Sequence, residues 1–296
     1  MATESINQLP LVVIVGPTAS GKTSMAIELA VACHGEIICA DSRTIYSHMD
    51  VGTAKPSQSE RAVVPHWGLD LVDPGQSFSV ADFKAYAVQK IEEIRQRGHV
   101  PFLVGGSGLY IDSVILDYHF GDKADPIFRA KLEAMDLVEL YEYCEKNNVS
   151  LPENYKNKRY VIRAIENRNI EQNRRITPVD NTIVVGIATD KTILRQRITQ
   201  RFEQMFENGI VEETTMLGEK YGWLNDAMRS NIYPIIHDYI DGRLSRDEAQ
   251  LAAETADWRL AKKQLTWFRR NKFIQWFELT EAKKYLAEQL AMHGQS

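Results

Sequence analysis

The sequence has little cysteine: Cys33, Cys39 and Cys144 are the three thiols among 296 residues. They form no Cys-x-x-Cys pair, and no histidine stands at ligand spacing from them, which argues against a structural zinc site. So few thiols also argue against a disulfide framework and indicate a reducing compartment, so we expect the protein in the cytoplasm. A chain of this length can bury enough apolar surface to fold without such cross-links.

The sequence also lacks long apolar runs. No stretch approaches the roughly 18 consecutive apolar residues of a membrane-spanning helix, so we expect no membrane partner. Met1–Pro10 contains Glu4 and no basic residue, so we expect no secretory signal peptide. Hydrophobic residues make up 44% of the chain and charged residues 25%, which excludes a disordered chain, a collagen or a coiled coil as the dominant class.

Positive charge is in slight deficit, because 35 Lys and Arg against 40 Asp and Glu give a net charge of −5. Taken alone, this balance argues weakly against a nucleic-acid-binding protein. The cations nevertheless cluster: Lys156–Arg175 holds seven of them against two Glu, and Trp258–Phe277 holds six and no acid. Aromatic residues interleave the second cluster, which suits phosphate contact and base stacking. Solvated helix faces would explain the cations equally well, and core packing is the better explanation for Trp267 and Phe268.

Short apolar segments alternate with helical periodicity along much of the chain. Helix starts are predicted near Ser24 and at two capping boxes, Ser79 with Asp82 and Ser245 with Glu248. Four segments rich in apolar and β-branched residues predict buried strands: 9–15, 36–40, 100–104 and 182–188. Strands and helices that alternate with short links predict an α/β fold on a parallel sheet.

Two segments interrupt this alternation. Residues 44–76 are rich in Gly, Pro and Ser and predict a long irregular loop, which in a compact domain is usually functional. Residues 119–178 lose the apolar runs and show helical periodicity with many charges, so we expect a helical insertion there that contacts RNA. Residues 1–118 and 179–296 are then expected to form the catalytic core, with a helical C-terminal part.

The strongest motif is Gly16-Pro-Thr-Ala-Ser-Gly-Lys-Thr23, which matches GxxxxGK[ST] between a predicted strand and a predicted helix. Its backbone N–H groups and the helix N-terminus would hold a phosphate, and Lys22 would add a positive charge. The Thr23 hydroxyl is the candidate Mg²⁺ ligand. The core is therefore expected to be P-loop NTPase-like, with a phosphate site made by Gly16, Pro17, Thr18, Ala19, Ser20, Gly21, Lys22 and Thr23.

The acid that accompanies this motif in ATP- and GTP-using proteins is not where it is usually found. In those proteins a carboxylate at the end of another strand holds Mg²⁺, but the third predicted strand ends in Gly105-Gly106-Ser107. The candidate acid is Asp41, which ends the second predicted strand, where open α/β sheets place their ligands. Its alternative role is that of a turn or helix cap.

A series of blocks along nearly the whole chain resembles the tRNA dimethylallyltransferases, also called tRNA isopentenyltransferases. The block Met49-Asp-Val-Gly-Thr-Ala-Lys-Pro56 is far more specific than the phosphate-binding motif alone. The blocks occur in this order: Gly16–Thr23, Asp41–Tyr46, Met49–Pro56, Pro65-His66, Asp73-Pro74, Phe78–Phe83, Val104–Tyr110, Asp125-Pro126, Arg129, Arg163–Glu166, Gln196–Phe202, Met205 and Ala261–Arg269.

The resemblance implies a Mg²⁺-dependent enzyme that moves the dimethylallyl group of dimethylallyl diphosphate to N6 of adenosine 37, beside the anticodon of a tRNA. It implies that Asp41 accepts the amine proton, that Ser107, where Thr is usual, lies near the ester oxygen, and that Arg201 and Arg197 bind the diphosphate. We expect a monomer that binds the anticodon stem-loop. The residues expected to contact tRNA are Asp41, Ser42, Arg43, Thr44, Arg129, Arg159, Arg163, Arg229, Lys262, Lys263 and Arg269.

Two segments depart from the family's pattern. Tyr160 stands where a second Arg is usual, and in Arg229–Ile235 an isoleucine, Ile232, replaces a glycine and Pro234 replaces a basic residue. Proline lacks a backbone donor and disfavours helix at the residue before it, Tyr233. Both segments are expected to touch RNA in this family.

Three alternatives stay open from the sequence. The first is an isopentenyltransferase that acts on free adenine nucleotides, against which the insertion and the cationic Lys262–Arg269 run count. The second is a P-loop kinase of a small metabolite, against which the Met49–Pro56 block counts. The third is a nucleotide-dependent RNA-binding regulator, which would have no need of Asp41, Ser107 and Arg201 together.

Overall fold

The computed structural model describes residues 9–120, 125–167, 174–229 and 232–294. Most of the segment considered for a signal peptide lies outside these ranges, as do residues 168–173 of the first cationic cluster with the charged residues Arg168 and Glu171. The chain divides into two compact units, of which one is Met1–Leu116 with Ile176–Ser296 and the other is Asp117–Arg175. The second unit begins two residues before the expected insertion and ends three residues before its expected end.

A six-stranded parallel sheet forms the centre of the larger unit, with strand order β3-β2-β4-β1-β5-β6. Val13 in the middle of β1 pairs with Leu103 on one side and with Val184 on the other. The strands are β1 (Leu11–Val15), β2 (Gly35–Cys39), β3 (His66–Trp67), β4 (Val100–Gly105), β5 (Thr182–Ile187) and β6 (Gln275–Phe277). The predicted α/β class and parallel sheet are confirmed.

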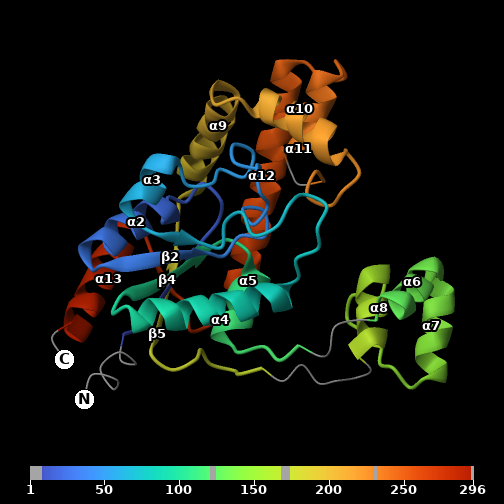
Figure 1. The fold of residues 1–296 in the computed structure, drawn as a ribbon, viewed down its shortest axis with the longest axis horizontal. Helices are drawn as coiled ribbons and strands as arrows, with labels where there is room; N and C mark the ends of the chain where they lie inside the picture. The colour runs from blue at the N-terminus through green and yellow to red at the C-terminus, as the bar shows by residue number, and fades with distance from the viewer. Residues whose placement is uncertain (1–8, 121–124, 168–173, 230–231, 295–296) are drawn as a thin grey trace. The chain divides into compact units, whose positions relative to one another are not determined.

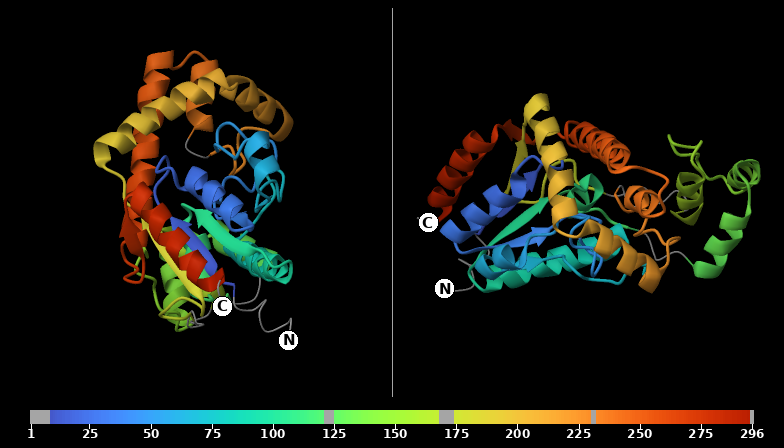
Figure 2. Two further views of the ribbon diagram at one scale, coloured as in Figure 1. Left: turned by 90° about the vertical axis from the view of Figure 1, so that its left-hand side faces the viewer. Right: turned by 90° about the horizontal axis from the view of Figure 1, so that it is seen from above.

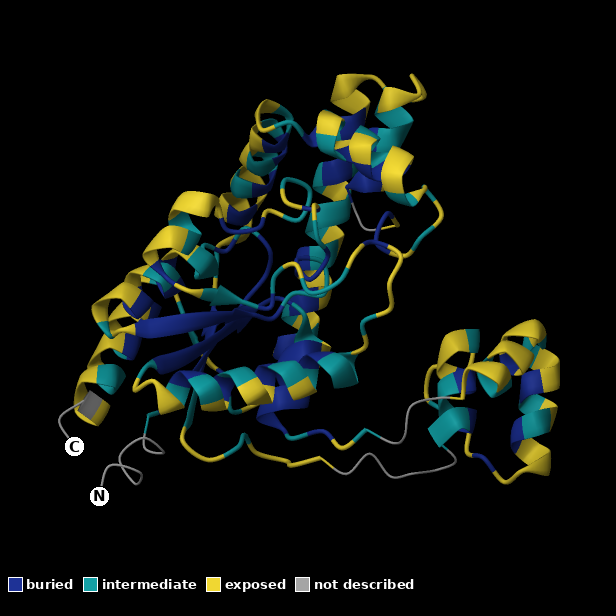
Figure 3. Ribbon diagram, viewed as in Figure 1, coloured by how far each residue is buried: buried dark blue, intermediate teal, exposed yellow. Residues whose placement is uncertain are grey.

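Helices cover both faces of this sheet (Figures 1 and 2). On one face α2 (Lys22–Ala32) and α13 (Leu279–Gly294) pack together, and Leu29 and Leu286 join a core with Val12 and Ile14. On the other face α4 (Val80–Gln96) and α5 (Gly108–Ile115) pack against β4. The central strands β1, β2 and β4 are buried along their whole length, as Figure 3 shows, because a helix layer covers either face, whereas the edge strands β3 and β6 are partly exposed.

The C-terminal part of the larger unit is helical, as expected. Helix α12 packs against α9 and α11, and α10 packs against α11. The capping boxes at Ser79 and Ser245 are both present and begin α4 and α12. The helices of this part are α9 (Lys191–Glu207), α10 (Ile210–Tyr221), α11 (Tyr233–Ile240) and α12 (Arg246–Phe268).

The described residues of the smaller unit form three helices around a core of their own. Asp125 and Asp136 cap the first two helices through their side chains. Leu132, Leu140 and Val161, one from each helix, are completely buried in its apolar cluster. The helices are α6 (Pro126–Ala134), α7 (Leu137–Lys146) and α8 (Lys158–Asn167).

The structure corrects three local expectations. The stretch 44–76 contains helix α3 (Gln58–Val63) and strand β3, although most of it is irregular, and β6 was not predicted. Helix α11 begins at Tyr233, because Pro234 lies in the first turn, where the missing N–H has no helical partner in any case. Within the described ranges, no helix combines the length and the hydropathy of a membrane span.

Candidate active site

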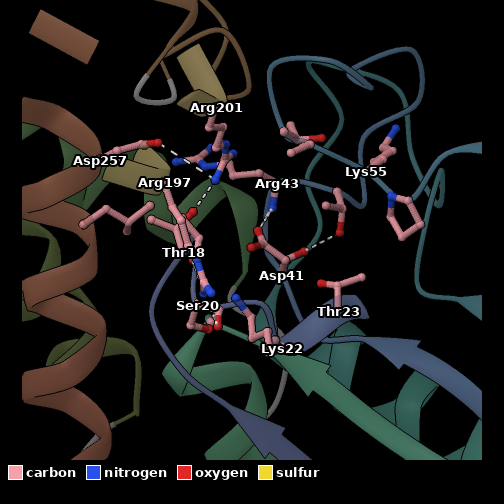
Figure 4. A pocket seen from close by; sticks show the side chains of 18 of the residues that line it. Thr18, Ser20, Lys22, Thr23, Asp41, Arg43, Lys55, Arg197, Arg201 and Asp257 are labelled. Atoms are coloured by element: carbon pink, nitrogen blue, oxygen red, sulfur yellow. Dashed lines mark hydrogen bonds and ion pairs between the residues drawn. The ribbon is translucent and has the colours of Figure 1, made fainter. Parts of the chain in front are cut away.

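A cavity of about 860 Å³ opens at the carboxyl ends of β1, β2 and β4. The phosphate-binding motif, the segment after β2, the loop before α3, and helices α9 and α12 all contribute to its lining (Figure 4). The cavity brings together predicted site residues from distant parts of the sequence: Lys22 and Thr23, Asp41, Ser107 and Arg201. Ligands of open α/β sheets bind at this edge.

The phosphate-binding loop has the backbone shape that its sequence predicts. Gly21 has φ +87°, which favours glycine, and Ala19 occupies the left-handed region with φ +60°. The Lys22 ammonium donates a hydrogen bond of 3.2 Å to the Pro17 carbonyl and thereby turns back over the loop. The pKa of Lys22 is lowered to about 8, mainly because burial disfavours the charged ammonium; the Asp41 carboxylate opposes this shift, and the neighbouring Arg201 adds to it. A polyanion bound here would stabilise the charged ammonium.

Two arginines of α9 contact the loop from one side. Arg197 donates to the carbonyls of Ala19 and Ser20 at 3.4 and 3.0 Å, which braces the loop. Arg201 donates to the Thr18 hydroxyl and lies 3.9 Å from a carboxylate oxygen of Asp257. The Nε–H of Arg201 is buried without a hydrogen-bond partner among the described residues, so the guanidinium retains donor capacity for an anion.

Gln264 and Asp257, both on α12, are site residues that the sequence analysis missed. The Gln264 side-chain oxygen accepts the backbone N–H of Thr18 at 2.8 Å, across 246 residues of sequence. Both residues line the cavity, and Gln264 is only 8% exposed. In the block Ala261–Arg269 the sequence analysis assigned the cations Lys262, Lys263 and Arg269 to tRNA and gave Gln264 no role. The helical spacing of Gln264 from Ala261 and Phe268, which are buried, is the signal that could have identified it.

Asp41 lines the cavity, and one of its two carboxylate oxygens accepts a hydrogen bond. Its Oδ1 accepts the backbone N–H of Arg43 at 2.9 Å, so the side chain does cap a turn. Its Oδ2 has no hydrogen-bond partner in the described part of the chain and is left to face a ligand. The capping role and a role in chemistry therefore coexist in one carboxylate.

The Ser107 hydroxyl is held in place by Ser42. It accepts the backbone N–H of Ser42 at 2.9 Å and donates to the Ser42 hydroxyl at 3.3 Å. Two partners restrict a hydroxyl that would otherwise rotate freely on its unbranched side chain. The methyl group that threonine would supply is thus not needed to orient this oxygen.

The loop before α3 forms another part of the wall, and its lysine is fully engaged. The Lys55 ammonium donates to the Tyr46 carbonyl at 2.6 Å, to Asp50 at 2.8 Å and to Asp70 at 2.6 Å. An ammonium has three hydrogens, so none is left for a phosphate. Lys55 therefore has a structural role in this loop. Glu213 of α10, a further residue that the sequence analysis missed, binds this loop from outside.

The residues expected to contact tRNA fall into two groups in the larger unit. Ser42, Arg43 and Thr44 line the cavity with Asp41, and Arg43 also donates to the Asp226 carbonyl at 3.2 Å. The other group consists of exposed cations outside the cavity: Arg229, Lys262, Lys263 and Arg269.

The smaller unit holds the remaining expected tRNA contacts. Arg129 and Arg163 both donate to the Glu166 carboxylate, at 3.2 and 3.3 Å, so they also stabilise the unit. Arg159 is exposed, and so is Tyr160, which is 50% accessible. These side chains stand on a unit separate from the cavity.

The aromatic residues of Trp258–Phe277 pack against the protein. The Trp267 indole N–H donates to Asp112 at 2.8 Å, and Phe268 is completely buried. Trp276 of β6 lies against Gly186. The expectation of core packing is confirmed for Phe268, whereas Trp267 is half-buried against Gly108. The cations of this segment are left as its RNA-binding candidates.

The cavity offers few ligands for a divalent cation. No cluster of three His, Cys, Asp or Glu side chains occurs in the described ranges. The Thr23 hydroxyl has no hydrogen-bond partner among the described residues and lines the cavity with Asp41. Mg²⁺ usually keeps several waters and binds through one or two protein ligands together with substrate phosphates. This sparse donor set therefore fits Mg²⁺ that arrives with a diphosphate.

Comparison with protein families agrees with the order of the sequence blocks. A model described as IPP transferase matches residues 44–271, and a model described as isopentenyl transferase matches residues 9–66. The tRNA dimethylallyltransferases of Bacillus mycoides and Anoxybacillus flavithermus are 38% and 39% identical to the chain. Each match covers 92% of this chain, with 90% and 91% of the respective relative.

Solved structures give the same result. The tRNA isopentenylpyrophosphate transferase of Bacillus halodurans is 35% identical with a TM-score of 0.72, over 97% of this chain and 98% of its own. A eukaryotic dimethylallyltransferase acting on tRNA is 22% identical with a TM-score of 0.77, over 91% of this chain and 73% of its own, and supports the fold. Since relatives above 30% identity match nine-tenths of its length, the chain belongs to the tRNA dimethylallyltransferase family.

Proposed function

We propose that the chain transfers the dimethylallyl group of dimethylallyl diphosphate to N6 of adenosine 37 in tRNA and releases diphosphate. Membership of the family makes it a tRNA dimethylallyltransferase enzyme. The observation that supports the finer assignment is one cavity in which the phosphate-binding loop and the Asp41 carboxylate face the same space. A donor diphosphate and an acceptor amine could meet there.

The phosphate-binding loop and its cations would carry the diphosphate half of the reaction. Breaking the allylic C–O bond leaves its electron pair on the departing diphosphate, so positive groups that surround it lower the barrier. Lys22 and Arg201 supply charge from two directions, and Arg197 braces the loop through its carbonyls. The Ser107 hydroxyl now donates to the Ser42 hydroxyl and would turn its one hydrogen to the ester oxygen as that oxygen becomes negative.

Asp41 would carry the acceptor half. The exocyclic amine of adenosine has a poorly available lone pair, and a carboxylate that accepts its N–H bond orients it toward the carbon. As the N–C bond forms and the C–O bond breaks, the amine gives one proton to the Oδ2 of Asp41. The hydrogen bond from the Arg43 backbone leaves Oδ2 for this purpose.

Mg²⁺ would bind at the Thr23 hydroxyl and would partly neutralise the diphosphate charge. The Asp41 carboxylate, which lines the same cavity, is the other side chain considered as a ligand for Mg²⁺. Its amine-facing role and a metal-ligand role would compete for Oδ2, so we assign the metal to Thr23 alone on the protein's side.

The tRNA would be bound by cations outside the cavity. Base-modifying enzymes take their target base out of its stack, and basic side chains hold the backbone beside it. Lys262, Lys263 and Arg269 on α12 are exposed for that purpose. The cations of the smaller unit, Arg129, Arg159 and Arg163, would add contacts to the anticodon stem-loop.

We propose that the enzyme acts as a monomer. The three cysteines are free, which agrees with a reducing compartment, and we place the enzyme in the cytoplasm. Analytical ultracentrifugation with and without tRNA would test the first point, and a sedimenting dimer that alone carries activity would contradict it.

The function is tested by incubation of the protein with dimethylallyl diphosphate, Mg²⁺ and unmodified tRNA, followed by digestion and mass spectrometry of the nucleosides. We expect adenosine heavier by one five-carbon unit, mapped to position 37, and no product when AMP is the only acceptor. Prenylated AMP without modified tRNA would instead support the enzyme of free nucleotides. Absence of both products would contradict the proposal.

A further inference from the structure

Glu213, on α10, binds the loop that precedes α3 (residues 49–56). Both of its carboxylate oxygens accept hydrogen bonds from this loop, and one of them also accepts a hydrogen bond from a tyrosine. One carboxylate oxygen accepts the backbone N–H groups of Asp50 and Val51, at 2.8 and 2.7 Å. The other accepts the N–H of Gly52 at 2.9 Å and the hydroxyl of Tyr233 at 2.8 Å. Four donors converge on one carboxylate, and three of them are successive main-chain groups.

Tyr233 presses the same loop from its ring side. It is completely buried, and both burial and the adjacent Glu213 carboxylate raise the pKa of its hydroxyl far above the ordinary value. A Cβ atom on Gly52 would lie 2.6 Å from the Tyr233 ring, so only glycine permits this approach. The main chain at Gly52 is therefore held by a hydrogen bond on one side and by an aromatic ring on another.

The loop that is held in this way forms a wall of the cavity. Residues 52–56 all line it, together with Ile232, the neighbour of Tyr233. From within the core, Lys55 ties the loop to Asp50 and Asp70. Lys55 fixes the loop to Tyr46 and Asp70, whereas Glu213 fixes it to the helical C-terminal part.

This wall lies away from the two arginines that are assigned to the diphosphate. In Figure 4, Arg197, Arg201 and Asp257 lie on one side of Asp41, and Lys55 lies on the other. Asp41 stands between them and lines the cavity, and its Oδ2 has no hydrogen-bond partner among the described residues. If the diphosphate occupies the arginine side, the acceptor amine approaches Asp41 along the side that the 52–56 wall forms.

We propose that Glu213, together with Tyr233, is a positioning residue that fixes the wall of residues 52–56 against which the acceptor adenosine binds. The proposal rests on the function proposed above and adds its acceptor subsite. Neither side chain of the pair lines the cavity, so both act through the loop. Displacing the wall misplaces the amine relative to Asp41 and the donor carbon, and small misplacements are costly in rate.

The test is Glu213→Gln, measured as turnover of tRNA per site that binds dimethylallyl diphosphate. An amide in place of the carboxylate turns an NH₂ group toward two of the four donors, whichever way it is oriented. Loss of hydrogen bonds to a charged group predicts that kcat per site falls about 30-fold. The Kd of dimethylallyl diphosphate, titrated without tRNA, is expected to stay within about twofold.

Two further variants complete the experiment. Glu212→Gln changes the neighbouring glutamate on the same helix turn, which is exposed, and is expected to leave kcat per site unaltered. Tyr233→Phe keeps the ring on Gly52 and removes one donor, so kcat per site should fall about fivefold. If Glu213→Gln does not fold, fewer molecules of dimethylallyl diphosphate will bind per protein chain. In that case the milder Tyr233→Phe variant provides the test.

Unchanged kcat per site in a Glu213→Gln protein that binds the diphosphate would overturn the proposal. So would an equal weakening of diphosphate binding, because Glu213 would then support the whole cavity rather than the acceptor wall. An inactive wild-type protein would be a failure of the proposed function instead, and it would be seen before any variant is measured.

Discussion

Lys22 shows how the environment of one residue sets a property that its motif does not specify. The ammonium is buried among the loop, Arg201 and Asp41, and its pKa is lowered to about 8. In the free enzyme it therefore loses its proton within the range in which enzymes are commonly assayed. Bound diphosphate favours the charged form and raises this pKa again, so ligand binding and protonation are linked.

This linkage predicts that dimethylallyl diphosphate binds less tightly as pH rises through about 8. Below that pH Lys22 is already charged and the affinity is flat; above it the Kd should rise by up to about tenfold per pH unit. Calorimetric titration between pH 7 and 9.5 without tRNA measures this. Lys22→Arg, which stays charged, is expected to give a flat profile, and a flat profile in the wild type would contradict the prediction.

Asp41→Asn is the second prediction at this scale. The amide cannot accept the amine proton, so turnover should fall about 10²- to 10⁴-fold, while the Kd of dimethylallyl diphosphate changes by no more than about threefold. Asp41 also raises the pKa of Lys22, so the pH midpoint for diphosphate binding should move below that of the wild type. Steady-state kinetics and the titration above give both values; wild-type turnover would remove Asp41 from the mechanism.

At the scale of elements, local signals were predictable wherever one short stretch carries them. The capping boxes at Ser79 and Ser245 mark the starts of α4 and α12, because side chain and backbone lie within four residues of each other. Strands β3 and β6 have only two and three residues. So short an edge strand shows no periodicity, and its pairing depends on the strand beside it.

Helix α12 has two faces with different tasks, and this separation leads to the third prediction. Gln264 and Phe268 are buried, whereas Lys262, Lys263 and Arg269 are exposed. Changing the three cations to alanine should weaken tRNA binding. It should also reduce the slope of log K against log salt by about two to three, since each phosphate contact contributes roughly 0.7 to 0.9.

Filter binding at several salt concentrations measures that slope. The control is Lys283→Ala with Lys284→Ala on α13, where the first lysine pairs with Glu28 and the second is 80% exposed. We expect these changes to leave the slope unaltered. An unaltered slope in the α12 variant would place the tRNA on another surface.

At the scale of the whole molecule, the residues proposed to act on substrate could be predicted from the sequence, but the residues that hold the loops of the site in place could not. Lys22, Asp41, Ser107 and Arg201 follow from motifs or from the resemblance, and the sheet brings them into one cavity. Gln264 and Glu213 act across 246 and about 160 residues of sequence. Such contacts form only when the helical C-terminal part packs against the rest of the unit, so no local sequence pattern predicts them.

Glu36 gives a prediction for the stability of the larger unit. Its carboxylate is nearly inaccessible on β2 and accepts hydrogen bonds from Arg97, His99 and Trp67. Burial alone raises the pKa of Glu36, but these hydrogen bonds outweigh it and lower the pKa to about 2. A carboxylate with a depressed folded-state pKa stabilises the fold above its unfolded value, 4.5, and loses that contribution as pH falls toward 2.

Glu36→Gln should therefore lower the free energy of unfolding by on the order of 2 kcal/mol at pH 7, with the partly exposed Arg97 limiting the effect. The difference from wild type should shrink as pH falls below 4.5, because the wild-type carboxylate becomes neutral as well. Urea unfolding followed by tryptophan fluorescence measures this in the larger unit, which holds all five tryptophans. Glu92→Gln, an exposed position on α4, is the control. A pH-independent difference would show that Glu36 contributes packing rather than charge.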